Sequence, residues 1–110
     1  MLKNNQNLYY TTPEVNDQLY LHFKGYKEIR NMQMFPNLKC LYFEGNGLRT
    51  ISGLTTNVNL KSLFLQQNMI AEITGLETLV NLGMLNLERN LIRKITGLSN
   101  CKKLETLIVS

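Results

Sequence analysis

The sequence predicts an α/β solenoid: a right-handed horseshoe with a parallel sheet on its concave side and short helical or 3-10 turns on its convex side. Two observations indicate this fold. The apolar skeleton of residues 60–81 recurs in residues 82–103 with a period of 22 residues, and residues 38–59 carry a third copy. Each copy has a short apolar alternation followed by apolar residues spaced three apart, which is typical of coils that each contribute one strand.

The copies follow the leucine-rich-repeat pattern L-x-x-L-x-L-x-x-N-x-L, except that Phe43 replaces one leucine. Alternation at the fourth and sixth positions, as at Leu63 and Leu65, places both side chains on one face of a strand. Apolar residues at the eleventh and fourteenth positions, such as Ile70 and Ile73, return from the opposite side of the coil. One coil is too small to bury them, so we expect the core to close by stacking neighbouring coils.

An asparagine occupies the ninth position of each clean copy, at Asn46, Asn68 and Asn90. The strand ends there, and a buried amide can donate to and accept from backbone groups that have left the ladder. We therefore predict a structural asparagine ladder.

A hydroxyl residue and a glycine precede each convex segment: Ser52 and Gly53, Thr74 and Gly75, Thr96 and Gly97. We expect the hydroxyl to cap a helical or 3-10 turn and the glycine to permit an unusual backbone conformation.

We predict a single domain with an N-terminal cap over residues 1–15 and leucine-rich repeats over residues 16–110. The repeats fall at residues 16–37, 38–59, 60–81 and 82–103, with a partial unit at 104–110. The first repeat is degenerate, because Asn16 replaces its first leucine and Lys24 its asparagine. A terminal repeat needs cover for its core, hence the cap. The partial unit has a strand but no convex side, so we expect a solenoid truncated at its C-terminal end.

The composition is that of an ordinary folded domain, with 110 residues, 44% hydrophobic and 18% charged. No apolar run approaches the roughly 18 residues of a membrane span, and the first residues lack the apolar centre of a secretory signal. We expect a cytoplasmic protein that does not bind a membrane. Cys40 and Cys101 fall two repeats apart on opposite sides of the coil, so we expect reduced thiols.

Residues for catalysis or metal binding are few. The only histidine, His22, is expected in one concave column with Glu44 and Glu88, with Gln66 between the two glutamates. Successive strands lie about 4.8 Å apart, whereas a metal needs two or three close ligands, so we predict no metal site and no cofactor. No glycine-rich phosphate loop or Ser/His/Asp set is present. We predict no catalytic residues, no enzyme activity and no small-molecule substrate.

The fifth-position column points away from the core on the concave sheet and reads Tyr20, Tyr42, Phe64, Asn86 and Ile108. One interpretation is that its three rings stack and support the sheet, at about 0.2–1 kcal/mol per pair. The interpretation we favour is a partner-binding face, because aromatic side chains concentrate in interface hot spots. The expected polar rim of that face consists of His22, Glu44, Gln66, Glu88 and Arg89.

Four segments resemble the leucine-rich-repeat dynein axonemal assembly factors. They are TPEVNDQLYLHFKGYKEI at residues 12–29, LKCLYFEGNGL at 38–48, LFLQQNMI at 63–70 and LNLERNLI at 85–92. The first is the specific one, because the repeat skeleton does not require it. The resemblance implies a cytoplasmic or cilium-associated protein of ciliated or flagellated cells. Such a protein helps to preassemble axonemal dynein arms, with axonemal dynein chains or co-assembly factors as partners. Family members carry more repeats, a C-terminal cap and a long further region, so we expect this chain to be a fragment.

Two other functions stay open. Repeats of this length also resemble those of a regulator of protein phosphatase 1, which would alter an enzyme's activity through the concave face. A protein component of an RNA-containing particle is the second, since the formal net charge is +4. The basic residues are spread over turns and the convex side, so we expect no direct contact with nucleic acid.

Overall fold

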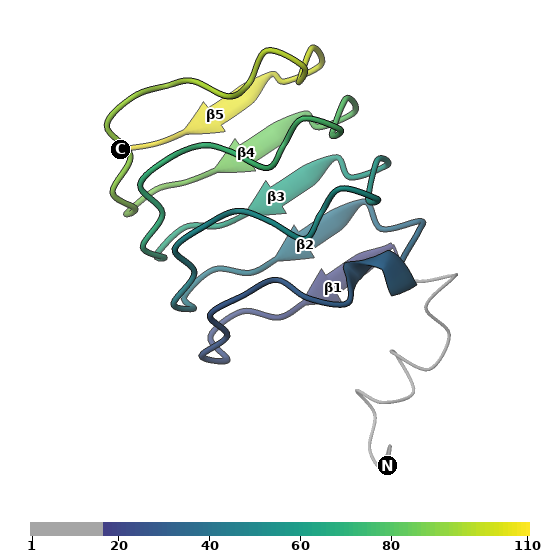
Figure 1. Cartoon of the computed structure of the whole chain (residues 1–110), viewed down its shortest axis with the longest axis horizontal. Helices are drawn as coiled ribbons and strands as arrows, with labels where there is room; N and C mark the ends of the chain where they lie inside the picture. The colour runs from purple at the N-terminus through teal and green to yellow at the C-terminus, as the bar shows by residue number, and fades with distance from the viewer. Residues whose placement is uncertain (1–16) are drawn as a thin grey trace.

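Short parallel strands form a sheet in the order β1-β2-β3-β4-β5 along the solenoid (Figure 1). The computed structural model describes residues 17–110, so the cap predicted over residues 1–15 lies outside the described residues. The described elements are β1 Gln18–Tyr20, the 3-10 helix η2 Met32–Met34, β2 Cys40–Tyr42, β3 Ser62–Phe64, β4 Met84–Asn86 and β5 Thr106–Ile108. This arrangement confirms the predicted parallel-sheet solenoid.

The strand register equals the sequence period. Leu19 pairs with Leu41, an offset of 22 residues, and every later strand pairs with the same offset. Each repeat position therefore lies beside the same position of the next repeat. The ladder also continues beyond the strands, because the Leu21 amide donates to the Tyr42 carbonyl at 2.8 Å, and equivalent bonds follow in the next repeats.

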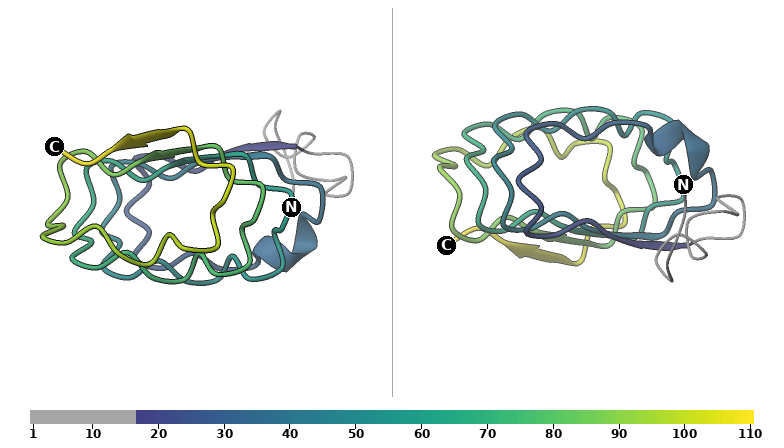
Figure 2. Two further views of the ribbon diagram at one scale, coloured as in Figure 1. Left: turned by 90° about the horizontal axis from the view of Figure 1, so that it is seen from above. Right: turned by 90° about the horizontal axis from the view of Figure 1, so that it is seen from below.

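The core lies between the sheet and the turns that return behind it, along the length of the solenoid (Figure 2). On the sheet side, Leu41, Leu63 and Leu85 are completely buried. On the convex side of the second repeat, every third residue is buried: Leu48, Ile51, Leu54, Asn57 and Leu60. Full burial of such an apolar side chain contributes about 1.5–3 kcal/mol, so stacked coils gain together what one coil cannot.

The convex side has less helix than predicted. Among residues 17–110 the only helix is η2 in the first repeat, and the three clean repeats carry turns and bends there. The Asn57 amide donates to the Leu54 carbonyl at 3.0 Å and the Leu60 amide to the Asn57 carbonyl at 3.1 Å. These bonds to the third residue back are isolated. A run of such bonds is needed for a 3-10 helix, so single turns form instead.

Glycines at the convex turns allow neighbouring coils to approach closely. Gly75 has a φ of +77°, and a Cβ placed on it would overlap the carbonyl oxygen of Ile51 in the preceding repeat. Gly53 and Gly97 have the same conformation and the same kind of contact. No described helix follows Ser52, Thr74 or Thr96, so the helix-capping role predicted for these hydroxyls is wrong.

A ladder of asparagine side chains joins the repeats where the strands end. Asn68 Nδ2 donates to the carbonyls of Phe43 and Leu65 at 3.1 and 3.0 Å. Its Oδ1 accepts from the Leu48 amide at 3.0 Å. Phe43 and Leu48 belong to the preceding repeat, so one side chain connects two coils. The same arrangement recurs at Asn46 and Asn90.

The last complete repeat is covered less than the others. The sequence pattern gives Ile51, Ile73 and Ile95 the same core position, yet their exposed fractions are 1%, 2% and 53%. The convex turn of the next repeat, at Gly75 and Gly97, lies against the first two isoleucines. The chain supplies no such turn for Ile95.

We predict that Asn68→Ala lowers the free energy of unfolding by about 1–3 kcal/mol, because it leaves buried backbone groups of two repeats without partners. Urea titration measures this effect. The matched control is Asn59→Ala, since Asn59 is exposed and makes one long bond of 3.4 Å to the Pro36 carbonyl. Equal midpoints for wild type and Asn68→Ala would contradict the structural role of the ladder.

A second prediction concerns coil packing. Gly75→Ala should destabilise the chain by roughly 1–2 kcal/mol through the left-handed backbone, and further because the new Cβ pushes against Ile51. Gly83→Ala is the control, because a Cβ there meets nothing nearer than 3.7 Å. Thermal unfolding of both variants checks this, and equal melting temperatures would show that the coils are not packed as described.

Candidate protein-binding face

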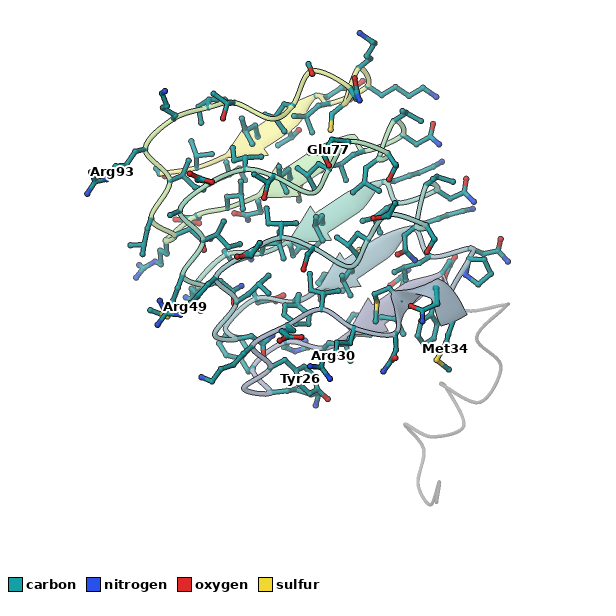
Figure 3. All side chains as sticks on the ribbon, in the orientation of Figure 1. Tyr26, Arg30, Met34, Arg49, Glu77 and Arg93 are labelled. Carbon is teal, nitrogen blue, oxygen red and sulfur yellow. The ribbon has the colours of Figure 1, made fainter. Side chains whose placement is uncertain are left out.

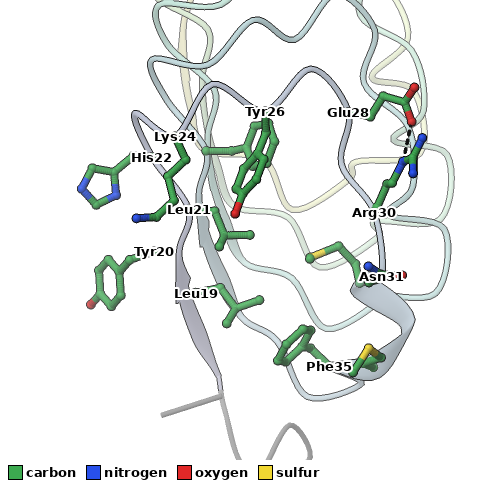
Figure 4. Close-up of a pocket in the computed structure, with 13 residues that line it drawn as sticks. Leu19, Tyr20, Leu21, His22, Lys24, Tyr26, Glu28, Arg30, Asn31 and Phe35 are labelled. Atoms are coloured by element: carbon green, nitrogen blue, oxygen red, sulfur yellow. Dashed lines mark hydrogen bonds and ion pairs between the residues drawn. The ribbon is translucent and has the colours of Figure 1, made fainter. Parts of the chain in front are cut away.

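The concave surface consists of side chains that alternate with the buried leucines. Figure 4 shows this on β1, where Leu19 and Leu21 point into the interior and Tyr20 and His22 lie on the other side of the strand. The register repeats this alternation on the following strands. We call Tyr20, Tyr42 and Phe64 the aromatic column, and His22, Glu44, Gln66 and Glu88 the polar column.

The aromatic column is a continuous stack of rings. Tyr20 and Tyr42 have ring centroids 4.7 Å apart with an interplanar angle of 9°, and Tyr42 and Phe64 are 4.6 Å apart at 4°. These distances match the spacing of neighbouring strands, so the parallel register itself brings the rings together. Tyr20 is 42% exposed, whereas Tyr42 and Phe64 are half-buried because each has neighbouring rings. The stack therefore leaves mainly ring edges open to a partner.

The column ends at Phe64. Asn86, expected to be an exposed member of the binding face, is only 9% exposed. Its Oδ1 accepts a hydrogen bond from the Glu88 amide at 3.0 Å, so the side chain bends back toward its own backbone. This short polar side chain satisfies the backbone after the strand, which the repeat pattern does not predict.

Phe23 belongs to this surface but was missing from the sequence-based site. It is 63% exposed, has a φ of 52°, and its ring lies over Gly45. It also meets His22 edge-on, with ring centroids 5.8 Å apart. A signal existed, because Phe23 and Gly45 share the eighth position, and a glycine beside a ring leaves room for it.

The polar column carries hydrogen-bonding atoms without partners. Within residues 17–110, His22 Nδ1, Glu44 Oε1 and Gln66 Oε1 are buried and make no hydrogen bond. The backbone keeps the column in register, since the Phe23 amide donates to the Glu44 carbonyl at 2.9 Å and the Gly45 amide to the Gln66 carbonyl at 3.0 Å. Buried polar atoms are normally paired, so these atoms mark a place where a partner group can bind.

Arg89 lies at the edge of the face and not within a column. It follows Glu88 on the turn after β4, with a φ of 62° and an exposed side chain. Its amide donates to the Ser110 carbonyl at 3.0 Å. Among the described residues, no ion pair is formed by its guanidinium.

The phenol and the thiol on β2 stay neutral at physiological pH. A side-chain hydrogen bond with Cys40, together with burial, raises the pKa of Tyr42 to about 12. Burial raises the pKa of the Cys40 thiol, and burial also raises that of Cys101. Both cysteines are free. Their neutral thiols are poor nucleophiles, since the thiolate is the reactive form.

Other chemical features lie away from the concave face. Arg49 and Arg93 project from turns at one edge of the solenoid (Figure 3). A hollow of about 1000 Å³ opens at the N-terminal end, with Leu21, Tyr26 and Phe35 in its wall. In the part of the chain that the structure describes, no three His, Cys, Asp or Glu side chains cluster as metal ligands would. No helix of that part has the length and apolarity needed to cross a bilayer.

Comparison with known proteins agrees with the fold. The family model described as Leucine Rich repeats (2 copies) matches residues 36–78 and 58–100. An internalin (inlF) from Listeria monocytogenes superposes with a TM-score of 0.80 and 30% identity, over 87% of this chain and 28% of that one. Internalin C2 of the same species gives a TM-score of 0.70 and 26% identity, over 83% of this chain and 40% of that one.

Curated relatives share a shorter segment. Dynein axonemal assembly factor 1 of Rattus norvegicus is 49% identical over 37 residues, which is 34% of this chain and 6% of that protein. The Homo sapiens protein matches equally over 5% of its length, and the Drosophila pseudoobscura pseudoobscura homolog is 51% identical over 2% of its length. The chain thus spans a small part of these relatives. The family match covers more than half of the chain, which belongs to the leucine-rich repeat family.

Proposed function

We propose that this chain is a protein-interaction scaffold without catalytic activity that acts in the assembly of axonemal dyneins. The observation that carries the proposal is the aromatic column, which places three stacked rings on the concave face without using them in the core. Aromatic side chains bury a large area with few rotatable bonds and are enriched at the centres of interfaces. A protein segment lying along the concavity is the occupant that such a surface suits.

The curated relatives support the dynein part of the proposal, since they are named as dynein axonemal assembly factors. On this proposal the partners are axonemal dynein chains or co-assembly factors. The place of action is the cytoplasm of ciliated or flagellated cells, before the dynein arms enter the cilium. The scaffold works by holding its partner, and no chemical step is required of it.

The geometry gives less support to direct RNA binding. Glu44 and Glu88 place negative charge on the concave face, where it would repel phosphates, and Arg49 and Arg93 lie on turns at the edge. No particular contact favours the regulation of a phosphatase. We therefore advance the scaffold alone.

The test is capture of dynein heavy or intermediate chains from an extract of ciliated cells, with the tagged chain as bait. Tyr42→Ala/Phe64→Ala should weaken capture about a hundredfold or more, because interface anchors contribute about 2 kcal/mol each. The loss of two stacked pairs should lower the free energy of unfolding by only about 1–3 kcal/mol in total.

The control is Arg93→Ala/Lys94→Ala on exposed turn residues, which should bind as wild type does. Melting temperature and affinity are measured on the same samples. If the aromatic double variant remains folded and captures dynein chains normally, the binding face lies elsewhere. If wild type captures no dynein chain, the dynein assignment fails.

A further inference from the structure

Three consecutive strands carry acceptor groups at one position of the polar column. Glu44, Gln66 and Glu88 are all half-buried, and the Gln67 amide donates to the Glu88 carbonyl at 2.9 Å as the preceding repeat does to Gln66. Neighbouring side chains are therefore about one strand spacing, roughly 4.8 Å, apart. Gln66 lies between two carboxylates.

The acceptors of this strip are not used by the chain itself. Glu44 Oε1 and Gln66 Oε1 are buried without a hydrogen bond within residues 17–110. Leaving a buried acceptor unpaired costs free energy, and it is the kind of exception that calls for a partner. The terminal torsions of Glu and Gln are soft, so a small rotation turns either oxygen toward the open face.

The charge of the strip is opposite to that of the whole chain. The formal net charge is +4, yet Glu44 and Glu88 make this strip negative. In the described part of the chain, the ion pair present joins Arg30 to Glu28 at 2.7 Å, outside the polar column. Arg89 follows Glu88 on a left-handed turn and forms no ion pair there. A cation from outside complements the strip.

An open aromatic face lies beside the same strip. Because Asn86 bends back and is only 9% exposed, no ring covers the face of Phe64 that is turned toward β4. The other face of Phe64 is occupied by Tyr42. A cation within about 6 Å of a ring face is attracted by its quadrupole, and a guanidinium also stacks on it.

We infer that the concave face binds an arginine side chain of a protein partner, with its guanidinium over Gln66, between Glu44 and Glu88 and against Phe64. The planar guanidinium offers five N–H donors in fixed directions, which suits acceptors on three strands, whereas a lysine ammonium is a single point charge. The partner is thus an extended protein segment with an arginine and apolar side chains beside it. This inference rests on the proposed function, since it specifies the chemistry of the same face.

The probe is N-acetyl-arginine amide, titrated into the isotope-labelled 110-residue chain and followed by backbone and side-chain amide resonances. We expect saturable shifts centred on Phe64 and Gln66. The neutral isostere N-acetyl-citrulline amide should give no saturable shift, and N-acetyl-lysine amide should bind several-fold more weakly. Equal responses to arginine and citrulline would overturn the inference.

Glu44→Gln/Glu88→Gln keeps the side-chain shape and removes both charges. It should weaken arginine binding about tenfold or more, since hydrogen bonds to charged groups are the stronger ones. The matched control, Glu72→Gln/Glu105→Gln, removes the same charge from exposed residues outside the columns and should bind as wild type does. Unchanged affinity in the first variant would also overturn the inference.

The capture assay separates this inference from the dynein assignment. If Glu44→Gln/Glu88→Gln captures dynein chains at the wild-type level while Tyr42→Ala/Phe64→Ala does not, the arginine site is wrong and the scaffold stands. If wild type captures no dynein chain but binds the arginine probe in a way that Glu44→Gln/Glu88→Gln abolishes, the site stands and the dynein assignment fails.

Discussion

The parallel register of 22 residues is the constraint on which the rest of the structure depends. It is held by backbone bonds such as that from the Leu21 amide to the Tyr42 carbonyl, and by asparagine side chains that bridge consecutive coils. One coil has too little interior to bury its leucines, so the energy of the fold lies between coils. Because register and sequence period are equal, every property of a repeat position becomes a column on the surface.

Columns explain how a regular fold acquires a specific face. Side chains at one position lie one strand apart, which is the distance at which aromatic rings stack, and the centroids of the aromatic column are 4.6 and 4.7 Å apart. Like charges at this spacing repel each other. In the polar column the neutral Gln66 separates Glu44 from Glu88, so two carboxylates share the face without being direct neighbours.

The face and the whole chain differ in electrostatic character. A net charge of +4 favours association with anions, while the two carboxylates of the polar column favour a cationic group beside the rings. Association driven by overall charge is screened by salt within about 10 Å, whereas recognition at a partly buried strip is screened less. This difference supports a protein segment, and not a phosphate backbone, as the occupant of the concavity.

The sequence by itself determined the period, the inward leucines and the asparagines at the strand ends, because these depend on spacing along the chain and the register adds nothing to them. The tertiary structure decided what depends on space between coils. It placed the Phe23 ring over Gly45, buried Asn86, left Ile95 uncovered and replaced convex helices with single turns. These features follow from which atoms fill the gap beside a residue, and residues 22 apart in the chain fill that gap.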